Sequence, residues 1–138
     1  MPYPDLLVQP MREDLVRLGF RELRTPDDVD DVLAGADEPV LVVVNSVCGC
    51  AAGAMRPAVA LSLRGDVSPP VLTTVFAGQD VEATQKAREY FVGYPPSSPS
   101  VALIKDGQPV FMLERHRIEG RSAEEISSDL ESAYKEHC

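Results

Sequence analysis

The chain has 138 residues, of which 44% are hydrophobic and 25% are charged, and its formal net charge is −9. This length suits one domain, residues 1–138, with a sizeable core, and the composition is ordinary for a globular protein. The acidic balance argues against nucleic acid and anionic membranes as partners, and no apolar run approaches the roughly 20 residues that a membrane span needs.

The first part of the chain predicts two helices with a short strand between them. Apolar side chains recur at helical spacing in residues 4–18, namely Leu7, Met11, Leu15 and Leu18. Pro10 lies inside this pattern and predicts a break or a fresh helix start. Residues 20–23 fit a short strand at a sheet edge, and residues 25–35 fit a helix with Thr25 as its N-cap.

The stretch 39–57, with the sequence PVLVVVNSVCGCAAGAMRP, organises the rest of the chain. Its apolar and largely β-branched run, residues 40–44, is typical of a strand buried on both faces. Two polar residues end the run, and Cys48-Gly49-Cys50 then opens a segment of small, helix-compatible residues. Pro57 in that segment predicts a kink or a restart of the helix. Two thiols therefore lie where a buried strand passes into a helix.

Strands and helices alternate through the remainder of the chain. In order, we expect a strand over 71–77, a helix over 81–91, strands over 101–104 and 109–113, and a helix from Ser122 to the end. Asp106-Gly107 predicts a tight hairpin turn, and Pro109 at the start of its strand suits a sheet edge. Ser122 with Glu125 forms a capping-box pattern.

This order of elements predicts the fold class. The first two well-defined strands are joined through a helix and should be parallel, with a right-handed crossover, whereas the hairpin adds two antiparallel strands. We therefore expect an α/β sandwich, in which a mixed four- or five-stranded sheet is flanked by helices. The strand over 40–44 should be central, and its C-terminal end should present Cys48.

The position of the two thiols favours redox chemistry. The thiolate is the reactive form of cysteine, and a helix N-terminus lowers the pKa of a thiol near it. Cys50, two residues from Cys48, can resolve a mixed disulfide on its neighbour. A disulfide across one intervening residue is hard to build with relaxed geometry, so we expect a strained, oxidising couple.

Other interpretations of the pair stay open. Cys48 and Cys50 could be half of a metal site or two small buried residues, because cysteine pairs in cytosolic proteins are typically metal-binding or catalytic. The chain has three cysteines, an odd count that gives no disulfide framework, and its N-terminus lacks the pattern of a secretion signal. We therefore expect a reducing, cytoplasmic location.

Several motifs together resemble a known fold and family. A redox cysteine motif after a central strand, a proline-bent helix and Ser98-Pro99 before a hairpin strand resemble the thioredoxin-like fold. In that fold a cis-proline before the hairpin faces the thiols, so the resemblance implies a cis Pro99, with an ordinary trans-proline as the alternative. The segment NSVCGCAAG at 45–53, followed by Arg56-Pro57, closely resembles the bacilliredoxins, a thioredoxin-like group with a CGC motif.

The bacilliredoxin resemblance covers essentially the whole chain and implies a function. Members of that family are cytoplasmic proteins of bacteria that use bacillithiol, and they remove bacillithiol from S-bacillithiolated client proteins. Some members show disulfide isomerase activity. The resemblance places the attacking cysteine at Cys48 and the second cysteine at Cys50. It implies bacillithiol as co-substrate with no bound cofactor or metal, and S-thiolated client proteins as partners; the oligomeric state is left open.

Four further residues are candidates for binding the substrate. Pro99, with Ser98 beside it, is expected to align the substrate disulfide. Ser46 is either a simple N-cap or a hydrogen-bond partner near the thiolate. Arg56 is either a solvated surface residue or a group that attracts a ligand carboxylate. The basic segment 115–117 has the same two interpretations, a solvated face or a site of substrate attraction.

The last residue, Cys138, has three interpretations. A terminal thiol is usually mobile and without function. If the last helix brought Cys138 near Cys48, it would be a third redox partner, and together with His137 and Cys50 these thiols would form a soft metal set. The competing function class is therefore a metal-binding or redox-sensing module that uses Cys48 and Cys50 without turnover.

Overall fold

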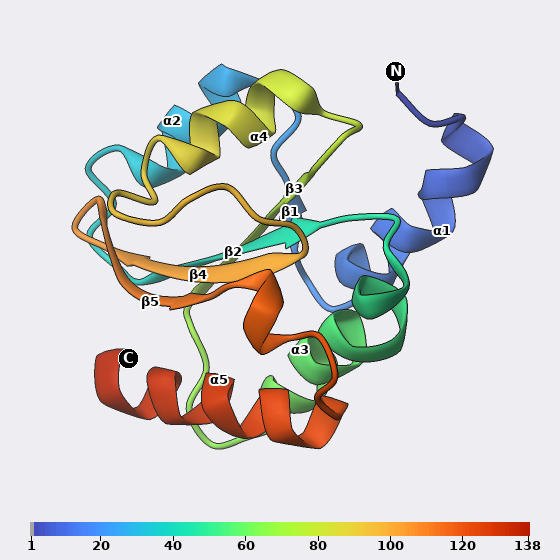
Figure 1. Cartoon of the computed structure of the whole chain (residues 1–138). Helices are drawn as coiled ribbons and strands as arrows, with labels where there is room; N and C mark the ends of the chain where they lie inside the picture. Colours follow the sequence, from blue (N-terminus) through green and yellow to red (C-terminus); the bar gives the residue numbers. More distant parts are fainter. Residues whose placement is uncertain (1) are drawn as a thin grey trace.

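A mixed sheet of five strands lies at the centre of the computed structural model, which describes residues 2–138 (Figure 1). Its strands are β1 (Arg21–Glu22), β2 (Val40–Asn45), β3 (Val71–Phe76), β4 (Ser100–Lys105) and β5 (Gln108–Leu113). The spatial order is β1-β3-β2-β4-β5, with β1 and β3 parallel to β2, and with β4 antiparallel to its neighbours β2 and β5. The predicted mixed sheet with a central strand over 40–44 is confirmed.

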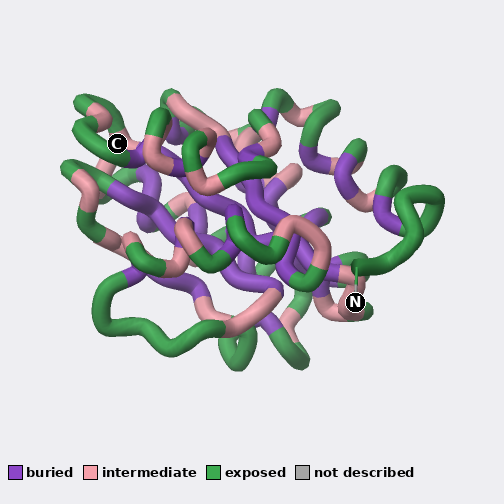
Figure 2. The backbone as a smooth tube through the Cα atoms, turned by 90° about the horizontal axis from the view of Figure 1, so that it is seen from above, coloured by how far each residue is buried: buried purple, intermediate pink, exposed green. Residues whose placement is uncertain are grey.

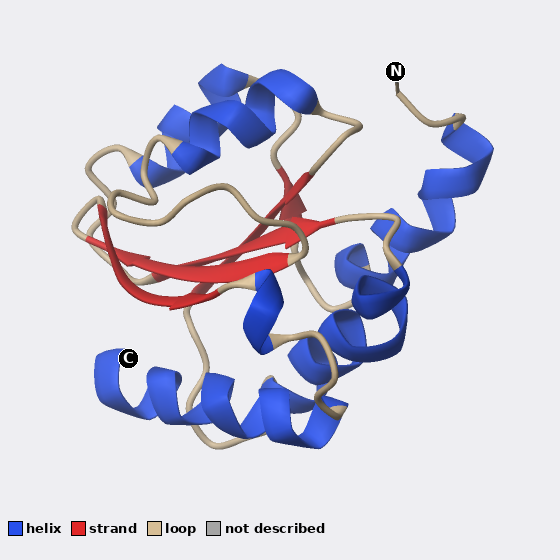
Figure 3. Cartoon of the chain, viewed as in Figure 1, coloured by secondary structure: helices blue, strands red, loops and turns tan. Residues whose placement is uncertain are grey.

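Helices cover both faces of this sheet, as Figure 3 shows. They are α1 (Asp5–Val16), α2 (Pro26–Leu33), α3 (Arg56–Ser62), α4 (Val81–Arg88) and α5 (Ala123–His137), with a π-helical segment at Ala51–Met55 and a 3-10 turn at Arg115–Arg117. The pair α2 and α4 packs on one face, and α3 and α5 pack on the other (Figure 1). No helix within residues 2–138 is long and apolar enough to cross a membrane.

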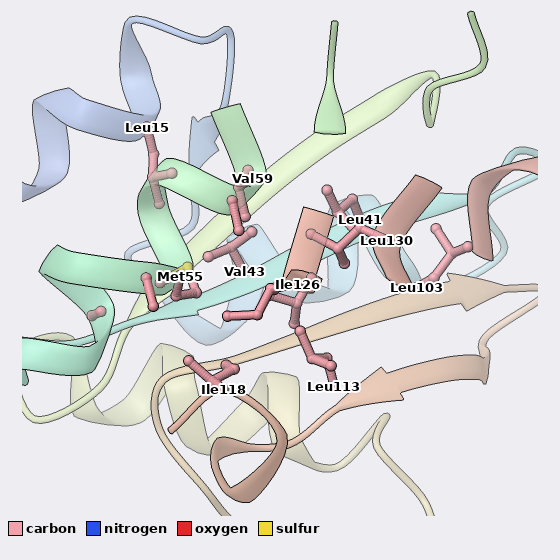
Figure 4. Packing of buried hydrophobic residues seen from close by; sticks show 14 of the residues in the cluster. Leu15, Leu41, Val43, Met55, Val59, Leu103, Leu113, Ile118, Ile126 and Leu130 are labelled. Atoms are coloured by element: carbon pink, nitrogen blue, oxygen red, sulfur yellow. The ribbon is translucent and has the colours of Figure 1, made fainter. Parts of the chain in front are cut away.

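The alternation of side chains along β2 explains why its sequence is entirely apolar. Leu41 and Val43 belong to the core on the α5 side, and Figure 4 shows them with Ile126 and Leu130 of that helix. The other β2 residues, Val40, Val42 and Val44, belong to the core beneath α2 and α4. Both faces of β2 are therefore buried, and Figure 2 shows the strands as the buried centre of the molecule with exposed loops around them.

The predicted break at Pro10 is wrong, because α1 continues through this residue. A proline inside a helix leaves the carbonyl of residue i−4 without its usual donor. That residue is Leu6, which is 93% exposed, so water can reach the helix at this point. The buried face of α1 also differs from the leucine pattern, since Val8 and Arg12 are buried and Leu7 is 47% exposed.

The helix after β2 is irregular where the sequence predicted it. The chain is helical from Gly49, passes through the π-helical segment and continues as α3, with Pro57 in the first turn of α3. A proline needs no donor in a first turn, and the predicted kink or restart at Pro57 is replaced by a π-helical segment that leads into α3 without a break.

Strand register brings three loops to one end of the sheet. Ser100, the first residue of β4, pairs with Val44, and Leu113 at the end of β5 pairs with Val101. The Ser98–Pro99 peptide bond before β4 is cis, as the resemblance implied. The Cys48 loop, the cis-proline loop and the chain after β5 therefore meet at the carboxyl end of β2 (Figure 1).

Candidate active site

Cys48 lies in the turn between β2 and the helix that follows it. Its backbone N–H donates to Ser46 Oγ at 3.2 Å, and its own Sγ accepts the backbone N–H of Cys50 at 3.4 Å. The Cys48 sulfur thus occupies the place of a capping side chain at the helix N-terminus. The Ser46 side chain stabilises the turn that leads to this cap, because its hydroxyl accepts the backbone N–H of Cys48.

The two cysteines of the motif are in direct contact and differ in acidity. Both thiols are free, and Cys48 Sγ lies 2.6 Å from Cys50 Sγ. Hydrogen bonds from the Cys50 thiol and backbone N–H, together with the charge of Arg115, lower the pKa of Cys48. Burial and the hydrogen bond to Cys48 raise the pKa of Cys50. Cys48 therefore ionises first, as an attacking thiol must.

Arg115 is a site residue that the sequence analysis did not single out from its basic segment. Its Nη2 donates to Cys48 Sγ at 3.3 Å, and its Nη1 donates to the Ser98 carbonyl at 3.1 Å. The neighbouring Arg117 instead pairs with Asp129 on α5. The predicted hairpin could have indicated the position of Arg115. An antiparallel return brings the residues after β5 back to the end of the sheet where Cys48 lies.

Ser98 is brought to the Cys48 pocket, and Pro99 is the next residue in the same loop. Pro99 is buried, and Ser98 lines the same pocket as Cys48. The Ser98 carbonyl and the Cys48 sulfur share one guanidinium, that of Arg115. This contact connects the cis-proline loop to Cys48.

The interpretation of Arg56 as a solvated surface residue is wrong, because this side chain is buried, and attraction of a ligand carboxylate stays a prediction. Arg56 is only 6% exposed and does not line the Cys48 pocket. Its Nη1 donates to Asn45 Oδ1 at 2.9 Å and to the Ser46 carbonyl at 3.1 Å, and its Nε pairs with Asp14 at 3.2 Å. Burial lowers the pKa of this guanidinium, and Asp14 opposes that shift. Arg56 therefore fastens the new helix to the end of β2 and to α1.

A pocket of about 370 Å³ opens beside Cys48. Its lining residues are Tyr3, Ser46, Val47, Cys48, Ala77, Gly78, Arg88, Ser98 and Arg115. Arg88, the last residue of α4, comes from a helix that the sequence gave no reason to connect with the thiols. The sequence carried no signal for it, because a basic residue in a last helical turn is ordinary.

Cys138 lies away from this site, so its predicted roles as a third redox partner and as a metal ligand with Cys48 are wrong. The His137 carbonyl accepts from Lys105 Nζ at 3.4 Å, and Lys105 ends β4 beside the first residue of β2. The C-terminus is therefore at the opposite end of the sheet from Cys48 (Figure 1). Within residues 2–138, no three His, Cys, Asp or Glu residues gather as a metal set.

Comparisons with known proteins agree with this geometry. A family model described as disulphide isomerase matches residues 3–138. A bacilliredoxin of Salinibacter ruber is 56% identical over 140 residues, covering 100% of this chain and 82% of that protein. A bacilliredoxin of Geobacillus kaustophilus is 51% identical over 142 residues, covering 100% of this chain and 98% of that protein.

Solved structures similar to this one include thioredoxins. The thioredoxin of Malassezia sympodialis has a TM-score of 0.55 and 18% identity, covering 86% of this chain and 90% of that chain. Mitochondrial thioredoxin 3 of Saccharomyces cerevisiae has the same score and identity, covering 86% and 96%. These structures establish the thioredoxin-like fold, and the sequence relatives establish the family. The chain therefore belongs to the bacilliredoxin family of thioredoxin-like thiol-disulfide oxidoreductases.

Proposed function

We propose that this protein removes bacillithiol from S-bacillithiolated client proteins in the cytoplasm, with Cys48 as the nucleophile. The observation that carries the proposal is the set of donors around one sulfur atom. Cys48 Sγ contacts the Cys50 thiol, the Cys50 backbone N–H and the Arg115 guanidinium, and each of these stabilises a thiolate. A half-buried thiolate beside a pocket is suited to attack a disulfide that enters from solvent.

The proposed transfer is one thiol-disulfide exchange. The electron pair of the Cys48 thiolate attacks the bacillithiol sulfur of the mixed disulfide, and a Cys48–bacillithiol disulfide forms. The client–bacillithiol disulfide breaks, and the client cysteine leaves as a thiolate that takes a proton from solvent. No electrons are gained or lost overall, because one disulfide replaces another.

The Cys48 adduct is resolved in one of two ways. Cys50 Sγ is adjacent to Cys48 Sγ, so deprotonated Cys50 can attack the Cys48 sulfur and release bacillithiol. Alternatively, the thiolate of a second bacillithiol attacks the bacillithiol sulfur of the adduct, which forms bacillithiol disulfide and releases Cys48 as a thiolate. The same exchange with a protein disulfide would rearrange that disulfide, so isomerisation is a second activity proposed for the same thiol.

The test uses a model client with a single cysteine that carries a bacillithiol mixed disulfide. Intact mass spectrometry follows the loss of the adduct for the wild type, Cys48→Ala, Cys50→Ala and the control Cys138→Ser. We expect the wild type and Cys138→Ser to remove the adduct and Cys48→Ala to be inactive. Cys50→Ala should accumulate the adduct on Cys48.

Two results would count against this function. Transfer by Cys48→Ala would show that another group attacks the disulfide. A wild type that transfers nothing, but binds stoichiometric metal that Cys48→Ala loses, would favour a metal-binding module over an oxidoreductase with turnover.

A further inference from the structure

Arg88 is a cation in the wall of the Cys48 pocket that has no carboxylate partner among residues 2–138. Its Nη2 makes a long hydrogen bond, 3.4 Å, to the Ser97 carbonyl. Its Nε is buried, and among the buried side-chain nitrogen and oxygen atoms of the described residues it alone has no hydrogen-bond partner. Burial lowers the pKa of the guanidinium, and no neighbouring acid offsets that shift.

The other arginine of the pocket is already engaged. Arg115 pairs with Glu119 and donates to Ser98 and Cys48. Arg12 is more buried than Arg88, but it has a carboxylate partner. Both of its terminal nitrogens donate to Asp80, at 2.7 Å and 3.0 Å.

The charge of the pocket differs from that of the whole chain. The net charge is −9, with 22 acidic residues, yet the described residues that line the pocket include two arginines and no acid. A partly buried guanidinium without an acid is costly to a fold, and it recovers that cost when an anion binds. The planar guanidinium matches a carboxylate, which it can bind through two parallel hydrogen bonds.

We propose that Arg88 binds a carboxylate on the low-molecular-weight thiol that is transferred to Cys48, which makes the pocket a subsite for the small thiol rather than for the client chain. This inference rests on the proposed function, because it names the chemistry of the group that the transfer moves. The ligand is an anionic, carboxylate-bearing thiol.

Such a subsite would select which sulfur Cys48 attacks. With its carboxylate held at Arg88, the small thiol occupies the pocket and its sulfur is the one beside Cys48. The Cys48 electron pair then forms a bond to the small-thiol sulfur, the bond to the client sulfur breaks, and the client thiolate leaves. Arg88 takes no part in the electron movement and acts as a binding residue for the group transferred.

The test compares two adducts that differ in one charge. A peptide with a single cysteine between Gly and Ser residues carries either 3-mercaptopropionate or its neutral amide, 3-mercaptopropionamide. The leaving group is the same in both, so differences in rate report recognition of the adduct. The rate constant for loading Cys48 is measured by quenched mass spectrometry in the full chain for the wild type, Arg88→Gln and Arg88→Lys. Arg64→Gln is the control, because exposed Arg64 does not line the pocket.

We expect the wild type to react about tenfold faster with the carboxylate adduct, the effect of one charged hydrogen bond. Arg88→Gln should lose this preference, so that it reacts with both adducts at the same rate. Arg88→Lys should retain part of the preference, and Arg64→Gln all of it. Thermal unfolding confirms that each variant is folded.

Three results would overturn the inference, and a fourth concerns the function alone. Equal rates for both adducts in the wild type would contradict the carboxylate subsite, but they would not contradict the proposed transfer to Cys48. Equal slowing of both adducts in Arg88→Gln would show a structural role. A third substrate distinguishes the source of the anion: it is a peptide with Glu beside the cysteine, and its adduct is the neutral amide. If Arg88→Gln slows the reaction of this substrate alone, Arg88 recognises the client rather than the small thiol. Failure of the wild type to react with any adduct would reject the proposed function on which the subsite depends.

Discussion

Arg115 Nη2 and Cys48 Sγ lie 3.3 Å apart, although the two residues are 67 positions apart in the chain. The same guanidinium donates to the Ser98 carbonyl, so one side chain joins Cys48 to the cis-proline loop. Arg115 is 44% exposed, and solvent therefore screens its charge. Its effect on Cys48 should be measurable but moderate.

Replacing Arg115 should slow the reaction of Cys48 with an alkylating agent at neutral pH. The Arg115 charge lowers the pKa of Cys48, so Arg115→Gln raises that pKa and reduces the thiolate fraction. An exposed charge pair of this kind changes the rate by about two- to fivefold. The measurement is the pH dependence of carbamidomethylation, with Arg117→Gln as a control that should behave as the wild type.

Replacing Cys50 separates its role as a hydrogen-bond donor from its role as a thiol. The first cause of the low Cys48 pKa is the hydrogen bond from the Cys50 side chain. Cys50→Ala removes this donor and should shift the alkylation profile of Cys48 to higher pH, whereas Cys50→Ser should keep most of the shift. Both variants should trap an adduct on Cys48 when no free thiol is present. Identical profiles for the two variants would contradict the assigned hydrogen bond.

Arg56 and Arg17 provide a matched pair for testing burial, since both pair with Asp14. Arg56 side-chain exposure is 6%, and that of Arg17 is 70%. Arg56→Gln removes a donor from the buried Ser46 carbonyl and one of the two donors of Asn45 Oδ1, which keeps the Ser46 N–H, so it should lower the free energy of unfolding by about 2 to 4 kcal/mol. Arg17→Gln should cost less than about 1 kcal/mol. Urea unfolding of both variants checks this difference.

Tyr134 should make the fold sensitive to alkaline pH. Burial raises its pKa to about 12, and its hydroxyl contacts Ser62 Oγ at 2.9 Å. The unfolded phenol ionises near pH 10. Below that pH the contribution of Tyr134 to stability is fully present, and it is lost as the pH rises from about 10 to about 12.

Tyr134→Phe should therefore reduce the loss of stability at alkaline pH. At neutral pH it should cost about 1 kcal/mol, because Ser62 keeps its bond to the Val59 carbonyl. Part of the alkaline loss should persist, since the hydrogen bond to Asp30 raises the pKa of Tyr90 to about 12 as well. Urea unfolding at pH 7 and at several values between pH 9 and 11 measures both effects. If the free energy of unfolding of Tyr134→Phe fell with pH as steeply as that of the wild type, the assigned role of Tyr134 would be contradicted.

Cys138→Ser should have no effect on transfer rates or on the alkylation of Cys48. Cys138 follows α5, at the end of the sheet opposite the active thiols. Intact mass spectrometry of oxidised protein should find no disulfide within one chain between Cys138 and Cys48. Detection of that bond would mean that the C-terminal helix leaves its place in this fold.

The main elements could be predicted from the sequence because each depends on local signals. The apolar run at 40–44 predicted a strand buried on both faces, and Asp106-Gly107 predicted the hairpin turn, where both residues have positive φ, 54° and 75°. The Ser122 and Glu125 capping box is also present. The exception is Pro10, where the exposure of α1 allowed the helix to continue.

The sequence by itself determined the candidate thiol pair and the cis-proline loop, because these lie in short motifs around Cys48, Cys50 and Pro99. Only the tertiary structure decided where the arginine side chains lie. Arg115 reaches Cys48 through strand register, Arg88 reaches the pocket from α4, and Arg56 turns inward to the end of β2. The sequence around an arginine is the same kind of sequence whether its long side chain extends into solvent or contacts a buried partner. Its role is therefore set by contacts between segments far apart in the chain.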